Sequence, residues 1–313
     1  MKSMKRCLGL LLSVSALLTA CGGSGTQIDP FKPTRIMAFG DELSVINNNG
    51  YKYTVNAVSD DVTPVLQCQN NPIWTQLLAA QFGLVFPQCN PSNATNPQGL
   101  ILAQPGAKVD DVRKQIDNQL ALNGVNSKDL ITVFAGMNDV LELYGQFPSL
   151  GRESLIAEAS TRGKTLAEQI NRLARADGRV VFATMPDMGL SPFALKEKAT
   201  HADTDRARLL SDLSESFNVA LKLNTISDGR FVGEVNFAED MAVQALAPGY
   251  YGYSNISDAS CKTDVVIPKC TNKTLVANAT GASHMWATDL FFGPTLHNTL
   301  GATARLRAVN LPF

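Results

Sequence analysis

The sequence lacks most features of a nucleic-acid binder, a disordered chain or a membrane-spanning protein. Its 313 residues carry 27 basic and 28 acidic side chains, so no positive excess is available to bind a phosphate backbone. No run of roughly eighteen apolar residues occurs, and no membrane-spanning helix is expected. With 45% hydrophobic and 18% charged residues, the composition is typical of a globular domain with a large core.

Residues that hold metals or phosphates are also scarce. The sequence has only three histidines, no Cys-x-x-Cys spacing and no glycine-rich phosphate loop. We therefore expect no metal, no cofactor and no nucleic-acid partner.

The N-terminus has the layout of a secretory signal. Lys2, Lys5 and Arg6 precede an apolar run over residues 8–18, and small residues follow. Residues 1–20 are therefore excluded from the fold. They end in Leu-Thr-Ala before Cys21, which resembles the lipobox of bacterial lipoproteins, in which the cysteine is diacylated and becomes the new N-terminus. A plain signal peptide with a chance cysteine is the alternative.

The lipobox resemblance implies that the protein is exported and that its membrane partner is reached through lipid on Cys21. Residues 21–32 then form a flexible, glycine-rich linker and residues 33–313 one domain. No aspartate follows Cys21, which by family analogy suggests outer-membrane sorting in a Gram-negative cell, facing the periplasm or the cell surface.

Four cysteines remain after Cys7 and Cys21 are assigned to the signal and the lipid. An even number in an oxidising compartment predicts disulfides, for which sequence alone permits three pairings. We favour the local one, because both pairs bracket loops rich in proline or asparagine; a zinc site is the rival. The favoured pairs are Cys68 with Cys89 and Cys261 with Cys270.

Short apolar runs alternate with longer amphipathic ones along the chain. This alternation predicts a mostly parallel sheet covered by helices on both faces, with ligands beyond the carboxyl ends of the strands. No repeat or second domain is evident, and residues 240–282 are interpreted as a long insertion. Expected strands cover 35–39, 130–135 and 179–184; expected helices cover 73–82, 108–122, 155–176 and 204–223.

Two motifs follow the first two clear strands. The segment 39–44 reads FGDELS and resembles the F-G-D-S-L-S block of the SGNH (GDSL) esterases and lipases; 136–139 reads GMND and resembles their G-x-N-D block. Segments 73–84, 186–192 and 251–258 are also similar to the family, the last to its lipase and phospholipase branch. The resemblance covers residues 35–308. It implies a three-layer α/β/α SGNH hydrolase fold and hydrolysis of acyl or lipid esters.

Family members use a Ser-His-Asp triad and preorganised donors for the oxyanion. The resemblance places two of these donors here, the backbone N–H of Gly106 and the side chain of Asn138. A turn at Gly106 and a helix N-cap at Asn138 are the structural alternatives.

The serine position of the family block holds Glu42. An ionised carboxylate there would occupy the oxyanion hole. Ser44, two residues further on, is the one substitute nucleophile that the block offers.

The other triad positions also differ from the family. Aligned without gaps, the segment 285–297 puts Thr288 at the acid and Phe291 at the base. Sliding by one residue makes Asp289 the acid but puts another phenylalanine at the base. His297, which matches a trailing family histidine, could pair with Ser44 only in a rewired site. His201 is interpreted as a solvated residue and His284 as a surface or capping residue, although His284 could, like His297, approach the cleft.

Carboxylates offer one further chemistry. Asp41, Glu42, Asp139 and Asp289 could gather at the strand ends for glycoside hydrolysis or cation binding, although turn-holding roles for Asp41 and Asp139 are the simpler interpretation. We therefore expect a catalytically degenerate SGNH lipoprotein that keeps its cleft for an acyl or lipid ester ligand. An active esterase using Ser44 or His297 is the alternative.

Overall fold

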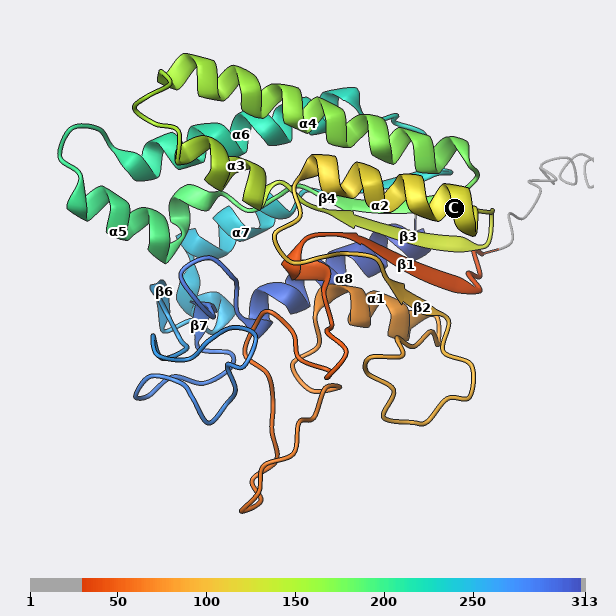
Figure 1. Ribbon diagram of the computed structural model, residues 1–313. Coiled ribbons are helices and arrows are strands. Elements are labelled where there is room, and N and C mark those ends of the chain that lie inside the picture. Colours follow the sequence, from red (N-terminus) through yellow and green to blue (C-terminus); the bar gives the residue numbers. More distant parts are fainter. Residues whose placement is uncertain (1–29, 311–313) are drawn as a thin grey trace, which may run out of the picture. The chain divides into compact units, whose positions relative to one another are not determined.

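The computed structural model describes residues 30–310 (Figure 1). Residues from Phe31 onward form one compact unit. The predicted signal peptide and Cys21 lie outside the described residues. Within the described part of the chain, no helix is both long and apolar enough to cross a membrane.

The centre of the fold is a five-stranded sheet in the order β2-β1-β3-β4-β5, and all its neighbouring strands are parallel. Nearly every residue of β1 and β3 is buried, as continuous apolar runs in a covered parallel sheet require. A small pair, β6 with β7, stands apart from this sheet. The strands are β1 (Arg35–Gly40), β2 (Gly99–Ile101), β3 (Asp129–Phe134), β4 (Arg179–Ala183), β5 (Val232–Val235), β6 (Asn255–Ala259) and β7 (His284–Trp286).

Helices cover both faces of the sheet, which gives the predicted three-layer α/β/α architecture. In Figure 1, α2, α3, α4 and α6 lie above the sheet, and α1 and α8 lie below it. The helices are α1 (Trp74–Gln81), α2 (Val109–Leu122), α3 (Met137–Tyr144), α4 (Arg152–Arg175), α5 (Pro192–Thr200), α6 (Arg206–Asn224), α7 (Phe237–Leu246) and α8 (Pro294–Asn310). Three short 3₁₀ helices are η1 (Glu42–Ser44), η2 (Met188–Leu190) and η3 (Pro248–Tyr251).

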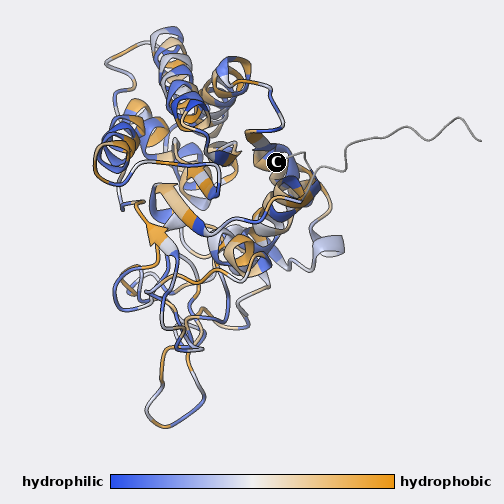
Figure 2. Ribbon diagram, turned by 90° about the vertical axis from the view of Figure 1, so that its right-hand side faces the viewer, coloured by the Kyte–Doolittle hydropathy of each residue, from blue (hydrophilic) through white to orange (hydrophobic). Residues whose placement is uncertain are grey.

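Aromatic rings pack around the end of β3 in the core. The ring centroid of Phe134 lies 5.9 Å from that of Trp74, 6.1 Å from that of Phe237 and 6.3 Å from that of Phe292. Figure 2 shows the hydrophilic residues on the outer surfaces of the upper helices. This packing joins α1, β3, α7 and the segment before α8 into one core.

Two segments made mostly of loops, 45–73 and 247–293, pack against each other. The side-chain amide of Asn56 donates to the carbonyl oxygens of Pro268 (2.8 Å) and Cys270 (3.1 Å), and Thr54 donates to that of Phe292 (3.0 Å). Buried Lys52 donates to three carbonyl oxygens in the loop before α1, those of Cys68, Asn70 and Asn71.

The favoured disulfide pairing is confirmed: Cys68 is bonded to Cys89, and Cys261 to Cys270. The boundary of the predicted insertion was wrong. Helix α7 continues to Leu246, so the irregular region begins after that helix and not at residue 240. The polar, aromatic composition of residues 240–282 does not mark where a helix ends.

Candidate functional site

The candidate site lies where β1, β2 and β3 end. Glu42 opens η1, separated by one residue from the end of β1; Gly106 follows β2, and Asn138 is the second residue of α3, after β3. Strands β1 and β3 are neighbours whose connections leave in opposite directions along the sheet. Parallel sheets of this order bind ligands at that position, because the diverging connections open a crevice there.

A glycine makes the sharp exit from β1. Gly40 has φ +133°, and a Cβ at this position would lie 1.9 Å from the carbonyl oxygen of Phe134. The side chain of Gln115 on α2 fixes this glycine, accepting from its N–H and donating to its carbonyl oxygen, both at 3.0 Å. Only glycine fits here, so the backbone that leads into Glu42 is tightly constrained.

The carboxylate of Glu42 binds both predicted oxyanion donors. The N–H of Gly106 donates to Oε1 at 2.6 Å, and Nδ2 of Asn138 donates to Oε2 at 2.9 Å. The residue is only 7% exposed, whereas Gly106 lies on the surface with φ +76°. Each carboxylate oxygen of Glu42 therefore accepts a hydrogen bond from one of the two predicted oxyanion donors.

Asn138 is oriented by further contacts. Its amide also donates to the carbonyl oxygen of Ala107 at 3.2 Å, and the N-cap of α3 is Gly136, so Asn138 is not itself the cap. The next residue, Asp139, accepts from the N–H of Val109 at 3.0 Å and forms an ion pair with Arg162 at 3.3 Å. Burial raises the pKa of Asp139 to about 6.

The four carboxylates of the alternative chemistry each have partners of their own, although the negative charges of Glu42 and Asp139 both act on Asp41. Asp41 caps η1 by accepting from the N–H of Leu43, and Asp289 forms an ion pair with Lys196 at 2.7 Å. Burial, followed by the negative charge of Glu42, raises the pKa of Asp41 well above its ordinary value. Between residues 30 and 310, no group of three His, Cys, Asp or Glu residues could hold a metal ion.

Ser44 and His297 are buried and are not bonded to each other. The hydroxyl of Ser44 accepts a hydrogen bond from Nε1 of Trp74 at 3.2 Å. Neither ring nitrogen of His297 has a partner, and its ring lies 4.5 Å from that of Phe292. Burial, assisted by the charge of Lys52, lowers the pKa of His297 to about 3. In this geometry, His297 is not placed to take a proton from Ser44.

The segment predicted to carry the acid and the base forms a tight turn after β7. The hydroxyl of Thr288 accepts from the N–H groups of Leu290 (3.3 Å) and Phe291 (3.0 Å), and the N–H of Ala287 donates to the carbonyl oxygen of Phe291. The ring of Phe291 meets that of Tyr53 edge to face, with centroids 5.5 Å apart.

Tyr53 is a site residue that the sequence did not indicate. Its pKa is raised by burial and then by the negative charge of Glu42, and its ring contacts Phe291. Tyr53 therefore lies near both Glu42, at the position of the family nucleophile, and Phe291, at the position of the family base. Tyr53 comes from an irregular loop without a motif, and no signal in the sequence marks it.

The remaining histidines lie elsewhere. Nδ1 of His284 is within hydrogen-bond distance of the Ser283 hydroxyl at 2.9 Å, and burial lowers the pKa of His284. His284 is buried because it lies in β7, so the surface alternative of its interpretation was wrong. His201 is exposed at the end of α5.

A groove of about 230 Å³ lies beside the turn. Its walls are the turn itself and the loop that contains the Cys261–Cys270 disulfide. Aliphatic side chains from that loop face it, including those of Val265 and Ile267, together with Leu290 and Phe291 from the turn.

Comparison with known proteins gives a family match and distant structural similarities. The model of the family described as GDSL-like Lipase/Acylhydrolase matches residues 36–285. A member of the lipolytic protein G-D-S-L family from Veillonella parvula DSM 2008 shares 13% identity over 86% of this chain and 95% of that one, with a TM-score of 0.43. An acetylxylan esterase from Geobacillus stearothermophilus shares 11% identity over 89% of this chain and 95% of that one, with a TM-score of 0.41. No curated protein matches this chain.

Proposed function

Because this chain belongs to the GDSL-like lipase/acylhydrolase family, we propose that it is a catalytically degenerate member, anchored to a membrane by lipid on Cys21, that keeps its cleft for binding. The observation that carries the proposal is the pair of hydrogen bonds from Gly106 and Asn138 to the carboxylate of Glu42.

Ester hydrolysis needs those donors for another purpose. The tetrahedral intermediate develops a negative charge on the former carbonyl oxygen, and donors must face that oxygen when it forms. A fixed carboxylate on the same donors blocks the position and repels a second negative charge. Glu42 therefore acts against the step that a family serine would start.

The predicted base position supports the same conclusion. A serine hydroxyl becomes a nucleophile only when a base removes its proton. The family alignment puts Phe291 at the base, and a phenyl ring accepts no proton. Thr288, at the acid, uses its hydroxyl to close the turn.

The ligand that we propose for the cleft is an acyl or lipid ester. The 230 Å³ groove beside the turn offers aliphatic and aromatic side chains to an apolar chain, and the charged side chains of Lys262 and Asp289 line it as well. Binding without turnover is then the activity of the domain, at the outer membrane and facing the periplasm or the cell surface.

The first test is fluorophosphonate labelling of residues 22–313, read by intact mass and peptide mapping beside a short-chain ester assay. We expect no adduct and a turnover equal to that of buffer. Labelling at Ser44 or any other single serine, with matching turnover, would establish the active-esterase alternative and refute the proposal.

The second test rebuilds the triad in steps. Glu42→Ser alone should restore no turnover, because no base lies ready to activate the new hydroxyl. The combined change Glu42→Ser, Thr288→Asp and Phe291→His should raise ester turnover at least tenfold above the single variant. An aspartate at 288 can still accept from the two N–H groups of the turn.

The two variants separate two kinds of failure. Turnover in Glu42→Ser alone would show that the protein already holds a base, against the proposed degeneracy. A folded but inert triple variant would instead count against the gapless alignment of the segment 285–297.

A further inference from the structure

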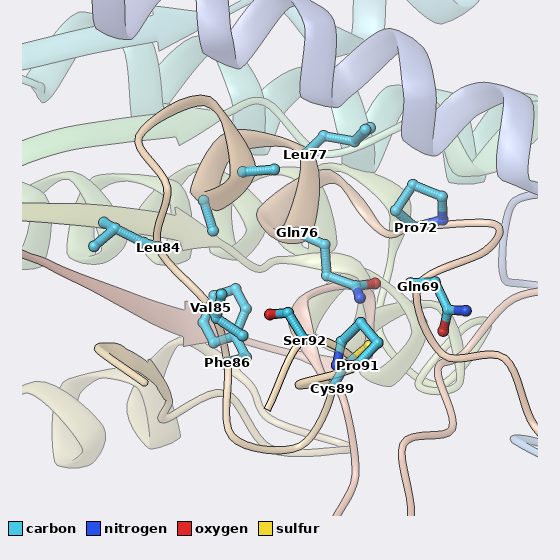
Figure 3. Close-up of a pocket in the computed structure, with 12 residues that line it drawn as sticks. Gln69, Pro72, Gln76, Leu77, Leu84, Val85, Phe86, Cys89, Pro91 and Ser92 are labelled. Atoms are coloured by element: carbon cyan, nitrogen blue, oxygen red, sulfur yellow. The ribbon is translucent and has the colours of Figure 1, made fainter. Parts of the chain in front are cut away.

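A second groove, of about 350 Å³, lies between α1 and the segment that follows it. Figure 3 shows Gln76 and Leu77 of α1 above the groove and Val85, Pro91 and Ser92 below it. It shares no lining residue with the groove beside the turn, and none of Glu42, Gly106 or Asn138 lines it. It is therefore a separate groove.

The groove has no charge. Its polar side chains are neutral, those of Gln69, Gln76 and Ser92, and its cysteine is in the Cys68–Cys89 disulfide. Moreover, the sequence from Val62 to Ala107 contains no Asp, Glu, Lys, Arg or His over 46 consecutive residues, although 18% of the whole chain is charged. An ionised group is the most costly kind of side chain to bring into an apolar phase, and this stretch contains none.

The chain enters the fold beside this groove. The ring of Phe31 packs against that of Phe82, at 6.2 Å between centroids, directly after α1. Eight residues lie between Cys21 and Pro30, so the nine steps from one to the other span at most about 30 Å. Lipid on Cys21 would thus hold the entry point of the chain within about that distance of the bilayer.

We infer that this groove binds one acyl chain of a lipid in the membrane that anchors the protein. The lining is mainly aliphatic, with no charged group to fix an ionic headgroup and no exposed aromatic ring on which a sugar could stack. Its volume lies at the lower end of the roughly 300–1,000 Å³ of ligand pockets, which suits a single chain. The inference rests on the proposed anchor only for the nearness of the membrane.

The test uses residues 22–313, which include the whole compact unit but not Cys21. Vesicles of phosphatidylcholine with a photoactivatable acyl chain are mixed with the protein, illuminated and sedimented, and adducts are mapped to peptides. We expect adducts within residues 69–92 and binding that does not change with salt, because no charges take part.

Two variants of one exposed position provide the matched control. Ala80 lines the groove and is exposed on α1, so both substitutions should fold. Ala80→Glu places a charge in the groove and should weaken vesicle binding at least tenfold, whereas Ala80→Gln, of similar size, should bind within about twofold of the wild type.

Three results would overturn the inference: no vesicle binding, equal binding by the two Ala80 variants, or adducts confined to the loop 59–66, whose Val62 and Val65 are exposed. The anchor is judged separately, from the mass of Cys21 in the full chain. An unmodified Cys21 beside a fragment that binds vesicles would refute the anchor and leave the groove as a lipid site.

Discussion

His297 illustrates how one buried residue lowers the stability of the protein at acid pH. Both of its ring nitrogens lack partners, and it stays neutral in the fold down to a pKa of about 3, against 6.5 when unfolded. Between these values the unfolded state binds more protons. Stability from this residue is therefore complete above about pH 6.5 and declines as the pH falls toward 3.

We predict that His297→Leu removes this part of the acid sensitivity. At about pH 4.5, the titration of His297 amounts to about 2–3 kcal/mol of the free energy of unfolding. The free energy of unfolding, measured with urea at pH 7 and at pH 4.5, should fall less between the two pH values in the variant than in the wild type, by that amount. His201→Leu, at an exposed histidine, is the control and should lose as much as the wild type. An equal fall in the free energy of unfolding in all three proteins would show that His297 is not the source of the acid sensitivity.

Single residues also show how far the sequence predicts the site. Glu42 and Asn138 were predicted from short motifs that follow two predicted strands, and Gly106 from the family resemblance alone; the structure joins the three by two hydrogen bonds. Tyr53 was not, because its contact with Phe291 depends on how two irregular segments meet.

At the scale of elements, the disulfides close loops of different size. Cys68 and Cys89 are 21 residues apart and enclose α1, whereas Cys261 and Cys270 are 9 apart. A bond that closes a longer loop removes more entropy from the unfolded chain.

Replacing both Cys68 and Cys89 by alanine should therefore lower the free energy of unfolding by about 3 kcal/mol, measured by urea unfolding. The matched change at Cys261 and Cys270 should cost less, about 2.5 kcal/mol on the same relation. A larger loss from the shorter loop would show that strain or packing outweighs loop entropy here.

The elements that were predicted from the sequence are those in which apolar residues recur with a strong period. Strands β1, β3 and β4 and helices α1, α2, α4 and α6 lie where the apolar patterns placed them. The three-residue edge strand β2 is too short to carry a pattern. Helix α8 buries small residues, among them Gly301, Ala304 and Ala308, which a hydrophobic pattern does not mark.

At the scale of the whole molecule, the proposed lipid decides where the protein resides. We predict that Cys21→Ser in the full chain abolishes labelling by a fatty-acid analogue and moves the protein from the membrane fraction to the soluble fraction. Cys7→Ser, within the predicted signal, should leave both unchanged. A Cys21→Ser protein that remains labelled and membrane-bound would exclude Cys21 as the lipid site.

The hydrogen bonds between the segments 45–73 and 247–293 limit how this part of the protein can be redesigned. Asn56 hydrogen-bonds to Pro268 and Cys270, and the N–H of Val58 donates to the side chain of Asn272 at 2.9 Å. Grafting one of these segments alone into another scaffold would leave its partner's carbonyl groups without donors. The two segments must therefore be transplanted together, as a single unit.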